Sequence, residues 1–487
     1  MSPRKVHPGE GSGTPRSTPV RHAGARGQGA ASGRSSNPVA VRQGALREHN
    51  LGLVLEQILD APKPISRATL AASTGLARAT VSALVDLLVS ARMVDELEPV
   101  ARRTAGRPAV PLVPARGTIA GIGLEVNVDY LGVRAIDLAG QVLAEELVAG
   151  DFRHSAPGPV LELLATHARA VHDQVTALGA RVAGACIALP GIVDRVSGPL
   201  RLAPNLGWSD LDLGELAARE PFARIGLRVA NEANLAAVAE VRVLEEARPS
   251  FLYVSGEVGI GGAFVHDGAV FSGEHGWSGE LGHTTVEPEG PRCTCGADGC
   301  LEVFAGKDAL MGAAGLHRDL PVDALIAAAD AGDAAALAAL ERGGRALGIA
   351  LSNFMNLTDV NHVILGGIYA PLSRLLVEHV RRELERRVLT ARWVDMRIEP
   401  SVAGTRAAMS GAANAVLRQV VANPGAWGAG SSDAWEQKIE GISSATPATP
   451  ATPATPASPA TPATPATRAS AAARTPAPTD AATQEVR

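Results

Sequence analysis

A cysteine-rich segment near the middle of the chain has the clearest chemistry. It contains three of the four cysteines of the 487-residue chain and has the spacing H-x9-C-x-C-x4-C. Three thiolates and one imidazole suit tetrahedral Zn²⁺ in a closed structural site. Gly296 and Gly299 let the backbone turn tightly enough for the sulfur atoms to converge. The predicted ligands are His283, Cys293, Cys295 and Cys300. The alternative is a group of buried free thiols beside an unrelated histidine.

Two acidic residues, Glu280 and Glu302, flank this segment. Carboxylates accept paired hydrogen bonds from hydroxyl groups, and an imidazole that binds metal through one nitrogen keeps the other free. The two glutamates therefore either support the metal ligands or face a hydroxyl-bearing ligand.

Composition restricts the class of protein. The length suggests about three domains, and hydrophobic residues, at 46%, are numerous enough to fill a sizeable core. Four cysteines in so long a chain argue against a secreted disulfide scaffold. The first 44 residues do not form a basic-then-apolar leader, and no apolar run reaches the ~18 residues that span a bilayer. We expect a soluble, cytoplasmic protein with no membrane partner.

Both ends of the chain are of low complexity. Residues 1–43 are rich in Gly, Ser, Pro and Arg, so we expect a disordered basic tail that either steers the protein toward DNA or is an inert solvated segment. Residues 422–487 contain a long Ala-Thr-Pro repeat, which favours extended polyproline II. We expect a disordered spacer there, with a ligand for a proline-recognising module as the alternative.

Residues 44–116 have the pattern of a winged helix-turn-helix domain. Apolar residues at helical spacing predict a helix from about Ala45 to Asp60, a short helix Arg67–Ser73 capped by Ser66, and a third helix from Arg78 to about Ala91. Thr74-Gly75-Leu76 supplies the turn between the last two helices. The alternative is a generic helical domain.

Two strand candidates follow these helices, at residues 93–97 and 109–113, and the arginine-rich segment 101–108 between them would form the wing. The residues placed to contact DNA lie in the second helix, at the start of the third helix and in the wing: Arg67, Arg78, Ala79, Thr80, Ser82 and Arg107. Ala77 stands where a serine often caps the recognition helix, which costs about 1 kcal/mol.

Residues 117–421 alternate between strand and helix patterns, which indicates an α/β domain whose site lies at strand ends. Strands are expected over 119–126, 130–136, 141–148, 182–189, 228–230, 251–254, 263–265, 269–271, 363–365 and 396–398. Helices are expected over 160–178, from 231 to about 246, and over 334–357, 371–388 and 405–421.

Several motifs together resemble the ROK family of repressors, open reading frames and kinases, in its transcriptional-regulator branch. The resemblance covers about residues 44–421. Its motifs are Gly106-Arg107-Pro108, Leu189-Pro190-Gly191, Asn231-Glu232-Ala233-Asn234, Gly259-Ile260-Gly261-Gly262, Gly279-Glu280-Leu281-Gly282-His283 and the run Cys-x-Cys-Gly-x-x-Gly-Cys-x-Glu from Cys293. It implies a two-lobed, actin-like sugar-kinase fold, each lobe on a ribonuclease-H-like core, behind an N-terminal winged helix-turn-helix.

The resemblance also implies a ligand site. It places sugar hydroxyls on Asn231, Glu280, His283 and Glu302, and a structural Zn²⁺ on His283 and the three cysteines. In the family's kinases the position of Glu232 holds the aspartate that acts as the base, so Glu232 is a ligand-binding residue with a degenerate base position.

Departures from the kinase pattern argue against phosphoryl transfer. A kinase of this fold needs Asp-x-Gly-Gly-Thr after its first strand, and this chain has Gly123-Leu124-Glu125-Val126-Asn127. Glu257 and Val258 also alter the second phosphate loop. We therefore expect no catalytic residue and no ATP.

The sequence thus predicts a sugar-responsive DNA-binding transcriptional regulator, most simply a repressor of carbohydrate uptake or catabolism genes. Its expected partners are operator DNA, a sugar or sugar derivative, and further copies of the chain in a homodimer or homotetramer. One alternative is an ATP-dependent sugar kinase that retains a DNA-binding domain, and another is a zinc-dependent sensor that binds no sugar.

Overall fold

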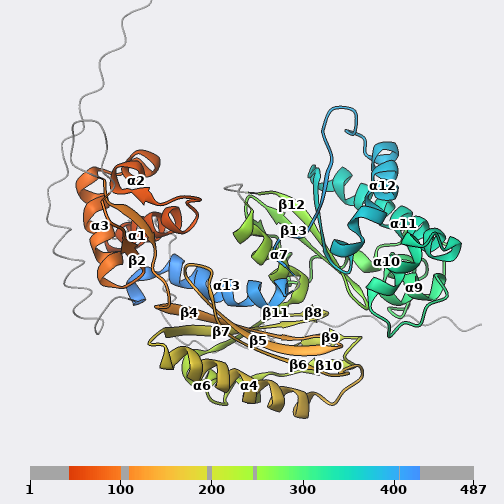
Figure 1. The fold of residues 1–487 in the computed structure, drawn as a ribbon, viewed down its shortest axis with the longest axis horizontal. Helices are drawn as coiled ribbons and strands as arrows, with labels where there is room; N and C mark the ends of the chain where they lie inside the picture. Colours follow the sequence, from red (N-terminus) through yellow and green to blue (C-terminus); the bar gives the residue numbers. More distant parts are fainter. Residues whose placement is uncertain (1–42, 100–108, 195–199, 245–248, 405, 428–487) are drawn as a thin grey trace, which may run out of the picture. The chain divides into compact units, whose positions relative to one another are not determined.

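The computed structural model describes residues 43–99, 109–194, 200–244, 249–404 and 406–427 (Figure 1). Three features expected from the sequence lie outside these residues: the basic segment 1–42, the arginine-rich segment 101–108 with Arg107, and the tail from residue 428 onward.

The N-terminal part contains three helices and a small antiparallel sheet with strand order β1-β3-β2. The elements are α1 (Gln43–Leu59), β1 (Ile65–Ser66), α2 (Arg67–Thr74), α3 (Arg78–Ser90), β2 (Val94–Glu96) and β3 (Pro111–Pro114). Their bounds agree with the expected helices and strands to within a few residues. In the first turn of α1, Leu46 is 54% exposed, because the packed part of this helix begins only at Leu51.

Local sequence explains where the second and third helices begin and end. The Ser66 side chain caps α2 by accepting a hydrogen bond from the Thr69 amide at 3.2 Å. Gly75, in the left-handed conformation, ends this helix at a φ of 73°. Ala77 precedes α3 and makes no side-chain cap, as its residue type predicts.

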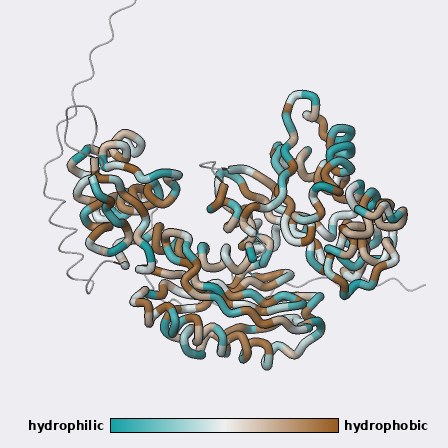
Figure 2. The backbone as a smooth tube through the Cα atoms, viewed as in Figure 1, coloured by the Kyte–Doolittle hydropathy of each residue, from teal (hydrophilic) through white to brown (hydrophobic). Residues whose placement is uncertain are grey.

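The first of two larger sheets has the strand order β11-β7-β4-β5-β6. Its strands are β4 (Ile119–Val126), β5 (Tyr130–Asp137), β6 (Val142–Ala149), β7 (Arg181–Leu189) and β11 (Leu227–Asn231). Every residue of the central strand β4 is buried, and its apolar run is visible in Figure 2. Helix α4 (Pro157–Ala177) covers one face, and α13 (Ala407–Ala422) lies over β4 and β7 on the other (Figure 1).

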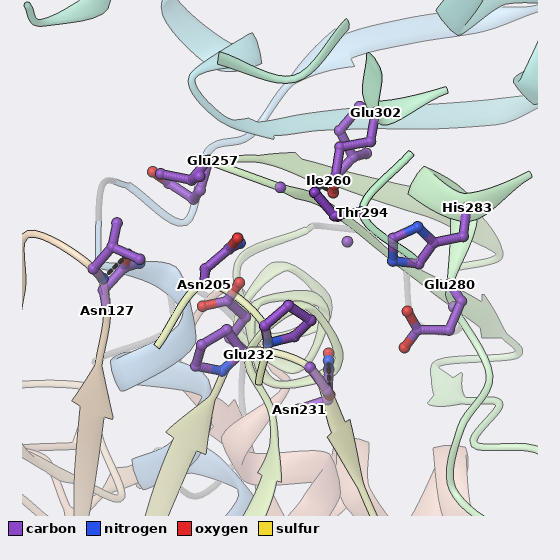
Figure 3. A pocket seen from close by; sticks show the side chains of 18 residues that line it. Asn127, Asn205, Asn231, Glu232, Glu257, Ile260, Glu280, His283, Thr294 and Glu302 are labelled. Atoms are coloured by element: carbon purple, nitrogen blue, oxygen red, sulfur yellow. Dashed lines mark hydrogen bonds between the residues drawn. The ribbon is translucent and has the colours of Figure 1, made fainter. Parts of the chain in front are cut away.

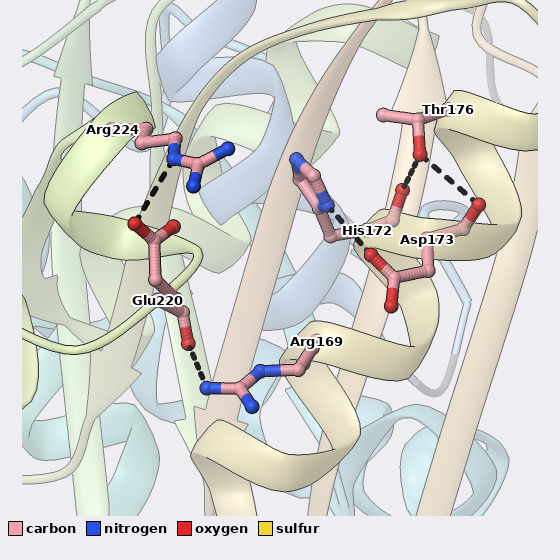
Figure 4. A network of polar contacts seen from close by, with 6 residues as sticks. All are labelled: Arg169, His172, Asp173, Thr176, Glu220 and Arg224. Carbon is pink, nitrogen blue, oxygen red and sulfur yellow. Dashed lines mark hydrogen bonds and ion pairs between the residues drawn. The ribbon is translucent and has the colours of Figure 1, made fainter.

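Surface contacts attach α4 to the short helices that precede β11, namely α5 (Gly214–Ala217) and α6 (Phe222–Ile225). Arg169 of α4 donates to the carbonyl oxygen of Glu220 at 3.2 Å, and the Glu220 carboxylate pairs with Arg224 at 3.0 Å (Figure 4). Both arginines are on the surface, so these contacts add little stability.

The second sheet has the strand order β14-β13-β12-β15-β16. Its strands are β12 (Phe251–Gly256), β13 (Ile260–His266), β14 (Ala269–Val270), β15 (His362–Gly367) and β16 (Arg397–Pro400). Its main hydrophobic cluster includes residues of α8 (Glu302–Ala305), α9 (Lys307–Ala313), α10 (Val322–Asp330), α11 (Ala334–Thr358) and α12 (Tyr369–Arg387).

Helices α7 (Glu232–Val243) and α13 connect the two sheets. Their alanines share one hydrophobic cluster with Cys186 of β7 and with Phe251 and Ile364 of the second sheet. The two helices pack closely, because a Cβ on Gly411 of α13 would lie 1.7 Å from the carbonyl oxygen of Leu235 of α7. Small side chains therefore hold α7 and α13 together as one unit.

The N-terminal helices pack against the far end of α13. Leu417 and Val420 of α13 belong to the same hydrophobic cluster as Leu51 and Leu55 of α1 and Leu84 of α3. The α/β elements and the N-terminal elements are therefore in direct contact through α13.

Short elements of the α/β part did not stand out in the sequence. They include the antiparallel strands β8 (Ile192–Val193), β9 (Leu200–Ala203) and β10 (Trp208–Leu211), which are too short to show a period of two. The glycines at 261–262 lie inside β13, which begins three residues before the strand expected over 263–265. Among the described helices, none is long and apolar enough to cross a membrane by itself; α2 and α3 meet the length and composition test only as a pair bent by 118°.

Candidate functional site

A polar pocket lies where the ends of several strands of both sheets meet. It contains about 690 Å³ of space, part of it open to solvent. All five predicted ligand-binding residues line it: Asn231, Glu232, Glu280, His283 and Glu302 (Figure 3). The structure therefore brings together residues that are separated by up to 71 positions in the sequence (231 to 302).

The start of α7 positions Asn231 and Glu232. The Asn231 side-chain oxygen caps the helix by accepting from the amides of Ala233 at 2.9 Å and Asn234 at 3.1 Å. Its Nδ2 donates to the carbonyl oxygen of Gly191 at 2.9 Å, which leaves one N–H for a ligand. Asn231 is thus first a structural residue, with limited capacity to bind a ligand.

Glu302 is anchored to the glycine-rich turn that precedes β13. Its Oε2 accepts from the Ile260 amide at 3.1 Å, and a Cβ on Gly259 would lie 2.7 Å from the same oxygen. The turn must therefore carry glycine for the carboxylate to reach the backbone. The other oxygen of Glu302 remains for the pocket.

The predicted metal ligands converge beside this pocket. One donor atom from each of His283, Cys293, Cys295 and Cys300 lies within 4.8 Å of all the others. The Sγ atoms of Cys295 and Cys300 are 3.6 Å apart, and Cys293 Sγ is 3.8 Å from His283 Nδ1. Tetrahedral coordination with Zn–S bonds of about 2.3 Å places sulfurs about 3.8 Å apart, so the donor set fits this ion.

The loop that carries the cysteines depends on Gly299. This residue has a φ of 66°, and a Cβ on it would lie 1.5 Å from the carbonyl oxygen of Glu287. No other residue type fits there without moving the backbone. The close approach places Cys300 in the buried part of the loop, next to the short helix η1 (Leu281–His283).

His283 contributes to both the metal cluster and the pocket. Its Nδ1 is the ring nitrogen that lies near Cys293, while the side chain lines the pocket (Figure 3). The second ring nitrogen is therefore left to face a ligand.

Sequence reasoning did not assign four polar residues of the pocket: Asn127, Asn205, Glu257 and Thr294. Thr294 lies between two predicted metal ligands, and Asn127 and Glu257 belong to the runs that depart from the kinase pattern, so their neighbourhood was a usable signal. Asn205 follows β9 in a segment that shows no pattern of its own.

Four acidic residues line the pocket, and burial raises the pKa of at least two of them. Burial raises the pKa of Glu257 to about 8, and the nearby Asp129 and Glu125 add to this effect. Burial also raises the pKa of Glu232 well above its usual value, with Glu125 and Glu257 contributing. The pocket therefore disfavours negative charge at both of these carboxyl groups.

Strand β4 packs closely against α13 at Gly123. A Cβ on Gly123 would lie 1.9 Å from the carbonyl oxygen of Met409 and 2.8 Å from the amide of Ala413. Glu125, only 3% exposed, accepts a hydrogen bond from the Tyr130 hydroxyl at 2.5 Å. The strand therefore has no room for an aspartate at position 123.

The residues expected to contact DNA differ in their surroundings. Arg78 and Ala79 are exposed in the first turn of α3, and Thr80 and Ser82 are half-buried behind them. Arg67 pairs with Asp86 of α3 at 2.7 Å and with Glu96 of β2, so DNA would have to compete with two carboxylates for it. Arg107 lies outside the described residues.

Two sheets with their covering helices around a polar pocket define a mixed α/β protein with a ligand-binding pocket at its strand ends. The ROK family profile matches residues 121–419, and the chain belongs to this family. It is 30% identical over 378 residues to the xylose repressor of Bacillus subtilis, an alignment that covers 76% of this chain and 96% of the repressor.

Solved structures of both branches of the family share the fold. A ROK family transcriptional regulator described as a homologue of the E. coli MLC protein has a TM-score of 0.65 at 26% identity, covering 78% of this chain and 97% of its own. The ROK hexokinase of Thermus thermophilus has a TM-score of 0.51 at 28% identity, covering 62% of this chain and 99% of its own. The regulator thus matches more of the chain than the kinase does.

Proposed function

We propose that this protein is a sugar-responsive, DNA-binding transcriptional regulator, a repressor of genes for carbohydrate uptake or catabolism. The observation that carries the proposal is that α7 starts in the pocket and ends against the N-terminal helices. Asn231 and Glu232 line the pocket at its first turn. Arg242, in its last turn, donates to the Leu59 carbonyl oxygen at the end of α1 at 3.0 Å.

In this proposal residues 44–116 form a winged helix-turn-helix domain and residues 117–421 form the sensor domain, between tails 1–43 and 422–487. The three helices and the small sheet of the N-terminal part have the order that a winged helix requires. The exposed first turn of α3, with Arg78 and Ala79, would enter the major groove.

The ligand of the sensor domain would be a sugar held through its hydroxyl groups. Glu280, Glu302 and His283 present the acceptors and donors that ring hydroxyls need. A structural Zn²⁺ on His283 and the three cysteines would fix the loop that carries these groups. The name of the Bacillus subtilis relative, a xylose repressor, supports a sugar as the effector class.

We propose that the chain is not a kinase. The tight contact between Gly123 and α13 and the buried carboxylate of Glu125 occupy the region where a kinase of this fold places its aspartate and phosphate-binding glycines. Similarity to the Thermus hexokinase keeps an ATP-dependent sugar kinase as the second candidate. Location in the cytoplasm and assembly into dimers or tetramers remain predictions.

Replacing Arg78 with alanine tests the DNA-binding assignment. If Arg78 contacts a base, this change should weaken binding to the DNA upstream of the protein's own gene by about 1–3 kcal/mol, roughly 5- to 150-fold. Fluorescence anisotropy with labelled DNA measures the effect. Arg224→Ala is the control, because Arg224 is an exposed arginine on α6 of the sensor domain. Equal affinity of the Arg78→Ala and Arg224→Ala proteins for this DNA would show that Arg78 does not contact a base.

Arg242 connects the two parts of the protein and should be needed for coupling. Its guanidinium also pairs with Asp60 at 3.0 Å and donates to the Leu138 carbonyl oxygen at 3.2 Å. Arg242→Gln should therefore keep both DNA binding and sugar binding, while sugar changes DNA affinity less than in wild type. Anisotropy titrations with and without sugar measure this coupling, with Arg224→Gln as the matched control. If sugar changes DNA affinity as much in the Arg242→Gln protein as in wild type, Arg242 does not transmit the effect of sugar to the N-terminal helices.

A further inference from the structure

We propose that the pocket binds an unphosphorylated sugar and that Glu257 makes it reject phosphorylated ones. The inference rests on the proposed sugar-binding function and narrows its ligand. The predicted ligand-binding residues would recognise ring hydroxyls. A free sugar and its phosphate share these hydroxyls, so the residues would not distinguish the two.

The ionisable side chains of the pocket wall are mainly acidic. Among the described residues that line it, Glu232, Glu257, Glu280 and Glu302 are acidic, His283 is the single basic side chain, and lysine and arginine are absent. Proteins hold phosphate groups with arginine, lysine or several N–H donors. A phosphate dianion in this pocket would lose its hydration and meet carboxyl groups instead.

The two cations that act electrostatically on Glu257 do not correct this imbalance of charge. Lys307 and Arg406 act electrostatically on Glu257, but neither lines the pocket. The Arg406 guanidinium lies over the Tyr130 ring, 4.4 Å from its centroid. Neither cation therefore forms part of the pocket wall.

Hydrogen bonds within the protein also occupy backbone amides near the glycine-rich turn. Such turns bind phosphate through free amides, and here three amides already have acceptors within the protein. The Glu257 amide donates to the Gly259 carbonyl oxygen at 2.8 Å, and the Gly262 amide donates to the Gly279 carbonyl oxygen at 2.8 Å. The Ile260 amide donates to Glu302. These three amides are therefore not free to bind a phosphate.

Glu257 itself is held in place at this turn. Its carbonyl oxygen accepts from the Lys307 amide at 3.3 Å, and a Cβ on Gly367 would lie 2.9 Å from its Oε1. The carboxyl group therefore packs against the end of β15 and has little freedom to move away from a bound phosphate. Its raised pKa agrees with this setting, since a pocket that disfavours one negative charge disfavours a dianion more.

Calorimetric titration of the zinc-loaded full chain with matched ligands tests the inference. The pairs are xylose and xylose 5-phosphate, glucose and glucose 6-phosphate, and N-acetylglucosamine and its 6-phosphate. The free sugar that binds should do so at least about tenfold more tightly than its phosphate, a difference of about 1.4 kcal/mol. In the Glu257→Gln protein this ratio should shrink at least about threefold, because the acidic group is removed. Glu378→Gln, on the exposed side of α12, should leave the ratio unchanged.

The outcomes separate the inference from the proposed function. A phosphorylated sugar that binds as tightly as its parent, or more tightly, overturns the inference and leaves sugar sensing intact. An unchanged ratio in the Glu257→Gln protein overturns the role of Glu257. If no member of any pair binds, the proposed sugar-binding function is wrong and the inference falls with it.

Discussion

Replacing Cys300 with serine is expected to remove bound zinc and to abolish the response to sugar, while DNA binding persists. Cys300 is fully buried, and its sulfur lies 3.6 Å from that of Cys295, so its loss opens a closed four-ligand site. The ion would fix the loop that runs from Glu280 and His283 to Glu302, and all three of these residues line the pocket. The N-terminal helices share no residue with that loop.

Three measurements check this result: zinc per chain by mass spectrometry, sugar binding by calorimetry, and DNA binding by anisotropy. Cys186→Ala is the matched control, because Cys186 is a buried cysteine in β7 outside the metal cluster. It should retain zinc and the sugar response. A Cys300→Ser protein that lacks zinc but still responds normally to sugar would show that the metal loop does not organise the pocket.

Adding one methyl group at position 123 is expected to cause a large loss of stability. Gly123→Ala would place Cβ 1.9 Å from the Met409 carbonyl oxygen, inside the contact between β4 and α13, where backbone on both sides prevents relaxation. We expect a loss of about 3 kcal/mol or more in the free energy of unfolding. Restoring the kinase aspartate by Gly123→Asp should therefore unfold the sheet and create no kinase activity.

Denaturant unfolding of the full chain measures this change. Gly158→Ala is the control, because a Cβ there meets no atom within 4 Å in the first turn of α4. It should be neutral or slightly stabilising. Equal stability of the two variants would mean that β4 and α13 are not packed as described, and the argument against an aspartate at position 123 would fail.

The sequence predicted the N-terminal helices well, because their bounds depend on local signals. Ser66 and Gly75 mark the ends of α2 by capping and by a positive φ, and both effects act within a few residues. The metal cluster was equally accessible, since four rare donor residues lie within one segment of the chain. Such features need no knowledge of tertiary contacts.

Contacts between distant segments could not be predicted from the sequence. In the sequence Arg242 is an ordinary helix residue. Its contact with the end of α1 is visible only in the structure. Asn205 lies in a turn without a motif, and the carboxyl group of Glu257 packs against Gly367, more than 100 residues away in the chain. These roles arise from packing between distant segments, which local propensity does not encode.

The most direct test of the central claim is an anisotropy titration of zinc-loaded protein on DNA from upstream of its own gene. It is run with and without a saturating sugar that calorimetry has shown to bind. The account predicts specific DNA binding whose Kd rises about 5- to 150-fold when the sugar is present. An unchanged Kd at saturating sugar would contradict it, as would consumption of ATP with that sugar.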